Sequence, residues 1–130
     1  MATRKQIREA IKTVIDPAFT RVYPGWRNSP DPRDFPCAMV FFDNGQPDRS
    51  FDGYDTEASL SIEIWASSAD SIDDALDLLG TEAKNLIEAD ETLGGLIDGI
   101  SLSDFGYDRD PESLAGALSL TFTVTYHDED

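Results

Sequence analysis

The sequence predicts an α+β fold, an α/β sandwich in which a mainly antiparallel sheet of four to five strands carries helices on one face. Two stretches, residues 57–66 and 117–126, alternate between apolar and polar side chains, the period that is typical of half-buried strands. A third stretch, residues 72–87, repeats its apolar residues at helical spacing. The order helix, two strands, helix, two strands favours a sheet with its helices segregated on one side.

The first element that we expect is an amphipathic helix near the N-terminus. Thr3 and Gln6 have the spacing of a capping box, and the apolar residues of the range 7–15 follow helical spacing. Asp16-Pro17 should end this helix, because a residue before proline is pushed out of the helical region. Five prolines within residues 17–36 then predict an irregular connection, with a short strand at Thr20–Tyr23. Trp26 in this connection is either a plug over the core or a contact residue.

Two strands and a second helix follow. We expect a strand at Cys37–Phe42, a turn at Asp43-Asn44-Gly45, a polar loop at Gln46–Thr56 and a long strand at Glu57–Ala66. The second helix should begin after Ser71 and run to about Ala89. Gly80 in its middle costs about 1 kcal/mol relative to alanine, which suggests close packing on the sheet. One or two further helical turns are expected within residues 91–97.

The last third predicts a strand from Ile100 to Tyr107, an exposed loop at Asp108–Glu112 and the strongest strand of the chain at 117–126. In this last strand the large residues lie on one side and the small or hydroxylated residues on the other. Five large side chains bring roughly 1.5–3 kcal/mol each if they are buried. The tail from His127 to Asp130 should be loose.

Length and composition indicate one domain over residues 1–130. Hydrophobic residues make up 40% of the chain and aromatic residues 10%, which disfavours global disorder. Charged residues interrupt the apolar positions of residues 7–15, so no signal-peptide core is present. No run of 18 apolar residues occurs either, and we expect a protein that is made in a reducing cytoplasm and has no membrane partner.

The charge of the chain is unevenly distributed. The formal net charge is −16, with residues 1–33 at +4 and the remainder at −20. This excess of acids argues against a protein that reads nucleic-acid sequence or docks on an anionic membrane. The basic and acidic parts have the charges needed to bind each other between copies, or to bind a partner, although an acidic surface also simply keeps a small protein soluble.

Catalytic and metal-binding motifs find little support. His127 is the only histidine and Cys37 the only cysteine, and we expect Cys37 to be a buried small hydrophobe rather than a nucleophile. Residues 48–55 match the opening of a calcium loop, but Ser59 replaces the glutamate required at its twelfth position. We therefore expect an acidic solvated loop that attracts divalent cations weakly, with no cofactor and no defined metal site.

The order of elements resembles a known family. The N-terminal helix is followed by Asp34-Phe35-Pro36 and the strand CAMVFF, then by an acidic loop and the strand SLSIEIWA. The chain continues with the helix after Ser71 and ends with Gly106-Tyr107-Asp108, an acidic loop containing arginine, and the strand LSLTFTVTY. In this order and in the last segment it resembles the phage tail terminator family, which the minor tail protein U of lambda-like tailed phages typifies.

The resemblance implies a virion protein made in the bacterial host cytoplasm and placed at the head–tail junction. Members of the family are α/β sandwiches that form a homohexameric ring. The ring caps the finished tail tube, stops its polymerisation and presents the surface that joins the head. The implied partners are further copies of the chain, the tail tube protein and the head–tail connector protein, and no enzymatic activity is implied.

On this interpretation the contact residues come from three segments. We expect bases of the first helix to face acids of a neighbouring copy, and two loops to meet the tube or the connector. The candidates are Arg4, Arg8, Lys12, Phe51, Tyr54, Asp108, Arg109 and Asp110. Phe51 and Tyr54 are either exposed anchors or side chains that fold back onto their own sheet. The Ser/Thr face of the last strand would line a subunit contact or the lumen.

Two alternatives remain open. A small acidic inhibitor that mimics nucleic acid, or an enzyme using two carboxylates, would also have this composition. Assembly size separates the first from a ring, because such a mimic usually stays monomeric or dimeric. In a ring, acidic subunits repel one another, so we expect salt to strengthen assembly through screening. Weakening by salt would instead mean that attraction between basic and acidic parts dominates.

Overall fold

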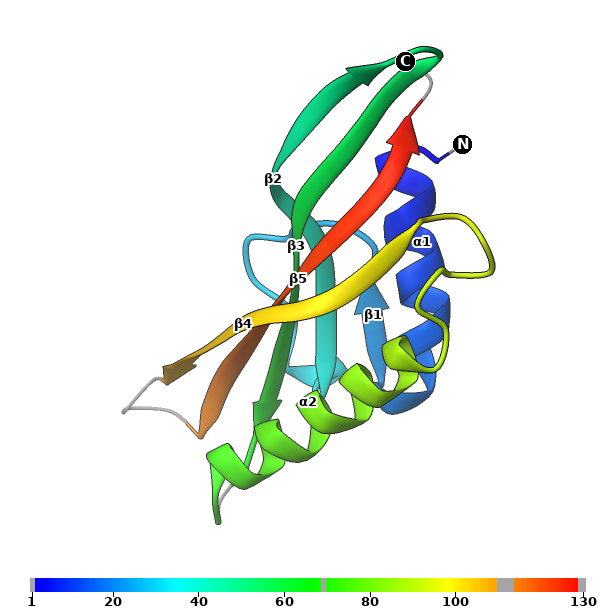
Figure 1. Cartoon of the computed structure of the whole chain (residues 1–130). Coiled ribbons are helices and arrows are strands. Elements are labelled where there is room, and N and C mark those ends of the chain that lie inside the picture. The colour runs from blue at the N-terminus through cyan, green and yellow to red at the C-terminus, as the bar shows by residue number, and fades with distance from the viewer. Residues whose placement is uncertain (1, 69, 110–113, 129–130) are drawn as a thin grey trace.

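The computed structural model describes residues 2–68, 70–109 and 114–128 (Figure 1). The helices and strands follow one another as α1 (Arg4–Ile15), the 3-10 turn η1 (Asp16–Ala18), β1 (Arg21–Tyr23), the 3-10 turn η2 (Pro32–Asp34), β2 (Cys37–Ser50), β3 (Gly53–Ser67), α2 (Ile72–Glu88), β4 (Gly99–Arg109) and β5 (Ala115–Asp128). The α+β class predicted from the sequence is confirmed.

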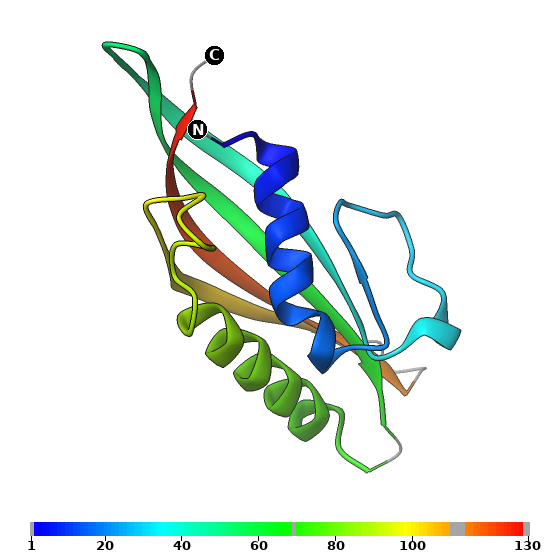
Figure 2. The same ribbon diagram turned by 90° about the vertical axis from the view of Figure 1, so that its right-hand side faces the viewer.

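The strands form one five-stranded sheet in the order β1-β2-β3-β5-β4. The pairs β2–β3, β3–β5 and β5–β4 are antiparallel, but β1 runs parallel to β2, so the sheet is mixed. The parallel pair arises because residues 24–36 return the chain to the end of the sheet at which β1 began. Both helices lie against the same face of the sheet (Figure 2).

The core lies between this face and the two helices. The alternation predicted for β3 and β5 is confirmed, since the large residues of both strands point inward. The main buried side chains are Ile7, Ile11 and Ile15 of α1, Leu76, Ala83 and Ile87 of α2, and Leu60, Ile62, Ile64, Leu118, Leu120, Phe122 and Val124 of the sheet. Burial of each large apolar side chain among them stabilises the fold by about 1.5–3 kcal/mol.

Local signals set the helix ends as expected. The Thr3 hydroxyl accepts a hydrogen bond from the Gln6 backbone amide, and the Gln6 side-chain oxygen accepts one from the Thr3 backbone amide. The two bonds complete the capping box of α1. The Ser71 hydroxyl caps α2 by accepting the Asp74 amide. Gly80 packs closely on the sheet, because a Cβ there would lie 2.7 Å from Leu118 Cδ2.

The prediction of a loop at Gln46–Thr56 is wrong. These residues continue β2 and β3 as a long hairpin that turns at Phe51 and Asp52, and the register runs unbroken from Asn44 to Ser50. The predicted turn at Asp43-Asn44-Gly45 is wrong as well, since it is a bulge within β2. Polar composition suggested a loop, but backbone pairing with β3 extends the strand beyond the core.

Two further strand boundaries differ from expectation. His127 and Asp128 belong to β5, where they pair with Asp55 and Tyr54 of the hairpin, so this part of the tail is not loose. Asp108 and Arg109 belong to β4 rather than to a loop, whereas Asp110 and the rest of the expected loop lie outside the described residues.

Residues 91–97 form hydrogen-bonded turns instead of helix. Leu93, Gly94 and Gly95 there have φ of 50°, 69° and 92°, which interrupt a helix. Two glycines in succession make this left-handed path accessible at little steric cost.

The second face of the sheet carries a smaller apolar cluster near β1. Tyr23, Cys37 and Met39 are buried there, and Phe35, Phe41 and Trp65 pack against them. The Phe35 and Trp65 rings stack at 6.3 Å between centroids. Cys37 is fully buried, as the sequence predicted, and burial raises the pKa of its thiol to about 11.

Candidate functional site

The two edges of the sheet carry opposite charge. Strand β1 forms one edge and β4 the other, with α1 packed near β1 and β2, and α2 packed on β3, β5 and β4. Residues 4–34, which we call the basic edge, have a net charge of +3, and residues 72–109, the acidic edge, have −8. The edges therefore form two different surfaces on opposite sides of the folded chain.

The candidate bases of α1 lie on the basic edge but differ in exposure. Arg4 is exposed, whereas Arg8 and Lys12 are half-buried. The Arg8 Nη1 reaches toward Gly25, coming within 3.2 Å of the position that a Cβ there would take. No ion pair among the described residues involves any of the three, so their charges are not neutralised by a salt bridge within that part of the chain.

Trp26 projects from the basic edge. Its side chain is 63% exposed and joins neither buried cluster, which excludes the expected alternative of a plug over the core. Next to it, the guanidinium groups of Arg21 and Arg27 lie 4.9 and 4.5 Å from the centroid of the Tyr23 ring. The Tyr23 hydroxyl donates to Asp34 Oδ2 at 2.5 Å, and this hydrogen bond with burial raises the pKa of the phenol.

The acidic edge contains an apolar groove between α2 and β4. Its volume is about 310 Å³, and it is lined by Asp77, Gly80, Thr81, Lys84, Leu102, Phe105, Tyr107, Leu118 and Leu120. Gly80 borders the groove where α2 packs closely on Leu118, because a Cβ at Gly80 would lie 2.7 Å from Leu118 Cδ2. Phe105 remains 61% exposed at the rim and meets the Tyr107 ring edge to face. The sequence pattern did not reveal this groove, because it joins residues distant in the chain.

The rim of the groove is held by contacts between α2 and β4. Arg109 donates to both carboxylate oxygens of Asp73, and its guanidinium lies 4.6 Å from the Tyr107 ring. The Tyr107 hydroxyl donates to Asp77, which raises the pKa of the phenol, while the bond from Arg109 lowers the pKa of Asp73. Arg109 is therefore engaged within its own chain, whereas Asp108 is exposed.

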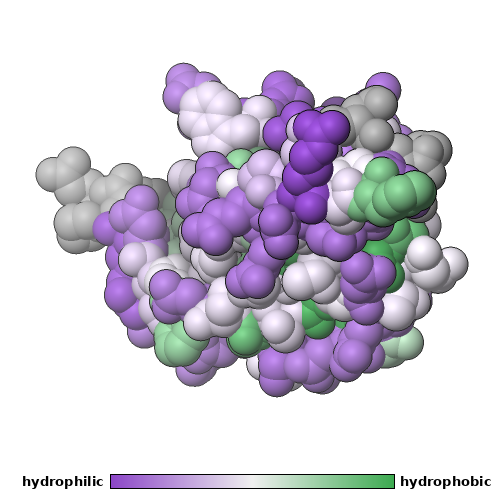
Figure 3. Space-filling view, turned by 45° about the horizontal axis from the view of Figure 1, so that its top comes forward, coloured by the Kyte–Doolittle hydropathy of each residue, from purple (hydrophilic) through white to green (hydrophobic). Residues whose placement is uncertain are grey.

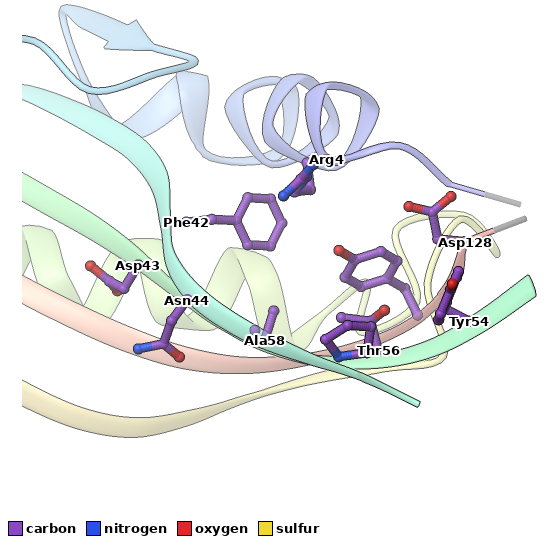
Figure 4. Close-up of a pocket in the computed structure, with 11 residues that line it drawn as sticks. Arg4, Phe42, Asp43, Asn44, Tyr54, Thr56, Ala58 and Asp128 are labelled. Atoms are coloured by element: carbon purple, nitrogen blue, oxygen red, sulfur yellow. The ribbon is translucent and has the colours of Figure 1, made fainter. Parts of the chain in front are cut away.

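The hairpin of β2 and β3 ends in an exposed aromatic residue. Phe51 is fully exposed at the turn, and Tyr54 is half-buried. Each of the two alternatives expected from the sequence therefore applies to one residue. Phe51 is an exposed side chain, and Tyr54 folds back toward its own chain. Tyr54 lines a pocket of about 490 Å³ between the hairpin and the start of α1, together with Arg4 and Phe42 (Figure 4).

His127 links the end of β5 to this hairpin. Its Nδ1 lies 2.9 Å from Asp55 Oδ1 and its Nε2 lies 3.2 Å from Asp52 Oδ1, although the second contact lacks hydrogen-bond geometry. The hydrogen bond to Asp55 and the two carboxylates raise the pKa of the imidazole above its usual 6.5. This link is not predictable from the sequence pattern, because Asp55 lies 72 residues from His127.

Hydroxyl groups line the middle of the sheet face that the helices do not cover. Ser61 pairs with Thr121, and Ser59 pairs with Thr123, across β3 and β5. The Ser61 hydroxyl donates to Asp43 Oδ2 at 2.5 Å. Glu63 is half-buried on the same face, and burial raises the pKa of its carboxyl. This polar and acidic centre borders the Tyr23 cluster, since Glu63 pairs with Met39 across β3 and β2.

The arrangement provides little for catalysis. Within residues 2–68, 70–109 and 114–128, no three histidine, cysteine or carboxylate side chains are grouped so that they could hold a metal ion. The calcium-like motif at residues 48–55 forms hairpin strands and their turn instead of a coordinating loop. None of the described helices is long and apolar enough to cross a bilayer. The surface seen in Figure 3 is mostly hydrophilic, with a few small and separate apolar patches.

Comparison with known protein families gives a match over nearly the whole chain. The family model described as phage minor tail protein U matches residues 2–126. Among solved structures, one similar chain comes from the virion of a native gene transfer agent particle, with 11% identity, a TM-score of 0.44, and coverage of 91% of this chain and 84% of that one. A similarity of that size carries no functional argument. No curated protein matches the sequence significantly.

Proposed function

The chain belongs to the phage minor tail protein U family, and on this premise we propose that copies of it form a ring that terminates the phage tail. Membership makes the chain a structural component of a virion. The proposal adds that six copies cap the finished tail tube, stop its polymerisation and present the surface that joins the head. The partners are then the tail tube protein and the head–tail connector protein.

The observation that carries the ring is the opposite charge of the two sheet edges. A closed ring needs a heterologous interface, in which one patch of each subunit binds a different patch of the next. The basic edge, at +3, and the acidic edge, at −8, lie on opposite sides of the subunit and would attract each other between copies. If this attraction dominates over the net repulsion of the acidic subunits, salt should weaken the ring rather than strengthen it. Arg4, Arg8 and Lys12 would then face acids of a neighbour.

The two ends of the strands supply the axial contacts. Phe51 projects from the hairpin end, while Asp108 and Arg109 lie at the end where β4 stops and β5 begins. β3 spans both ends with 15 residues, so the ends are about 45 Å apart. When neighbours meet edge to edge, the strand ends stay free, one for the tail tube and the other for the connector.

The uncovered sheet face suits the lumen of such a ring. At the middle of this face DNA passing through would meet hydroxyl groups and the carboxyls of Asp43 and Glu63, whereas Arg21 and Arg27 lie over the Tyr23 ring toward the β1 border. Carboxylates repel phosphates, and a surface that binds the backbone requires lysine and arginine. A lumen of this composition would let DNA pass without gripping it.

Negative-stain imaging of the purified protein, alone and mixed with tail tubes, tests the proposal. Rings, and tubes closed at one end, are the expected result. The triple variant Arg4→Glu, Arg8→Glu, Lys12→Glu should sediment as smaller species, because its basic edge is reversed. Arg49→Glu on the hairpin is the control and should still form rings. A protein that stays monomeric at all concentrations and leaves tubes uncapped would contradict the proposal and favour the acidic inhibitor.

A further inference from the structure

We propose that Trp26 of one subunit inserts into the groove between α2 and β4 of the next subunit. The inference rests on the proposed ring, and it names the contact that holds neighbouring subunits together. It assigns a role to an exposed aromatic side chain and to an apolar hollow that the fold of a single chain leaves empty.

Trp26 has the properties of an interface anchor. It is a large aromatic residue, 63% exposed, and its neighbours Arg21 and Arg27 are held in place over the Tyr23 ring. Tryptophan and arginine are the residues most often found to dominate binding energy at protein interfaces. Arg8 reaching toward Gly25 further fixes the segment that carries Trp26 against α1. The anchor is therefore presented by a supported segment.

The groove is a fitting receptor for an indole ring. Its floor consists of Leu102, Leu118 and Leu120, with the exposed Phe105 ring at its rim, and its volume is about 310 Å³. An aromatic side chain that enters an apolar site buries roughly 150–250 Å² of surface. Covering Phe105 removes an exposed aromatic ring from water at the same time.

Charge complementarity between the groove and the residues around Trp26 favours a second copy of this chain as the occupant of the groove. The groove is rimmed by Asp77 and belongs to the acidic edge, whose net charge is −8. Trp26 is accompanied by two arginines, so the plug brings positive charge to a negative rim. Lys84 also borders the groove, but it lies 3.5 Å from Glu88 on its own helix and is partly neutralised there.

The topology makes the contact directional. Trp26 belongs to the edge formed by β1, and the groove belongs to the edge formed by β4, the strand at the far side of the sheet. A plug and a socket on opposite edges cannot pair symmetrically in a dimer. Such a contact instead joins subunits head to tail, and the series closes into a ring when the rotation between neighbouring subunits is a whole fraction of a turn.

Complementation between two variants provides the sharpest test. Trp26→Ala removes the inserted indole, and Phe105→Asp places a charge at the rim of the groove. Each variant alone should form no rings. Loss of a tryptophan anchor should weaken association by about 30-fold or more. An equimolar mixture should form heterodimers and no rings. Only one contact remains possible in the mixture, between Trp26 of the Phe105→Asp variant and the intact groove of the Trp26→Ala variant. Thr81→Trp, which fills the groove from an exposed helix position, should act like Phe105→Asp.

Phe51→Ala is the matched control, because it removes an exposed aromatic residue far from both edges and should leave rings intact. In a Trp65→Phe background, Trp26 is the only tryptophan, and its emission should shift to the blue when rings form. Rings that persist in Trp26→Ala, or Trp26 emission that stays typical of water in assembled protein, would overturn the inference while leaving the ring itself intact. Wild-type protein that forms no rings would instead overturn the proposed function.

Discussion

Arg109 at the end of β4 donates two hydrogen bonds to Asp73 in the first turn of α2, from Nε to Oδ1 at 2.8 Å and from Nη2 to Oδ2 at 3.0 Å. This bidentate pair joins residues 36 positions apart in sequence and holds the helix to the strand beside the groove. The position of Asp73 near the helix N-terminus also suits its negative charge. Arg109, which is a predicted partner contact, thus also forms an ion pair within its own chain.

A double-mutant cycle should detect this pair. Arg109→Gln and Asp73→Asn should each lower the midpoint of thermal unfolding slightly at neutral pH, and the two effects should be less than additive. The lowered pKa of Asp73 means that its contribution is fully present above the usual value of 3.8 and is lost as pH falls through the lowered one. Asp74→Asn is the control and should show no coupling with Arg109→Gln. Coupling that persists at low pH would contradict the assignment.

Gly116 should tolerate no side chain. A Cβ there would lie 2.9 Å from Ile72 Cγ1 and 3.5 Å from the Asp108 carbonyl oxygen, so Gly116→Ala forces α2 and β5 apart. We expect a loss of about 1–3 kcal/mol in the free energy of unfolding, measured with urea. Gly106→Ala is the matched control, because a Cβ there meets nothing within 4 Å. An equal loss in both variants would contradict the packing argument.

The pH dependence of the hairpin should follow His127. Asp55 and Asp52 raise the pKa of the imidazole, so the ion pairs stabilise the folded chain fully below pH 6.5 and are lost as pH rises through the raised value. NMR titration of His127 should give a pKa above 6.5, and Asp55→Asn should lower it. Glu57→Gln removes a carboxylate from the same strand and should change the pKa less. A value at or below 6.5 in the unmodified protein would contradict the link.

Cys37 should resist thiol reagents while the protein is folded. Burial raises its pKa from 9.0 to about 11, so the reactive thiolate at pH 8 is about 100-fold scarcer than for an exposed thiol. Labelling should be slow in buffer and fast in denaturant, and Cys37 is the only cysteine to label. Fast labelling of native protein would mean that the edge formed by β1 and residues 24–36 opens readily.

Much of the fold could be predicted because its signals are local. The Thr3–Gln6 box, the proline after Asp16, and the alternation of β3 and β5 each depend on neighbours in sequence. The hairpin beyond Phe42 could not be predicted, because its residues are polar and are strand only through pairing with partners along the sheet. His127 was misplaced for the same reason, since Asp55 lies 72 residues away.

The candidate site was predicted less well than the fold. Phe51 projects from a hairpin tip, and the bases of α1 lie on one edge, as a contact role requires. The ion pair between Arg109 and Asp73 could not be predicted, because the two residues lie 36 positions apart in the sequence. The groove at Phe105 was missed, since Leu102, Leu118 and Gly80 become its walls only when α2 packs across β4 and β5.

The sequence by itself determined which residues face the core, where the helices begin, and that basic and acidic residues occupy different parts of the chain. Hydrophobic periodicity and helix capping depend on residues that are close in sequence, so both can be recognised without a structure. Only the tertiary structure decided that the two charged parts become opposite edges of one sheet, with Trp26 on one and an apolar groove on the other. Strand order sets that placement, and it depends on pairings between distant segments that hydrophobic patterning does not specify.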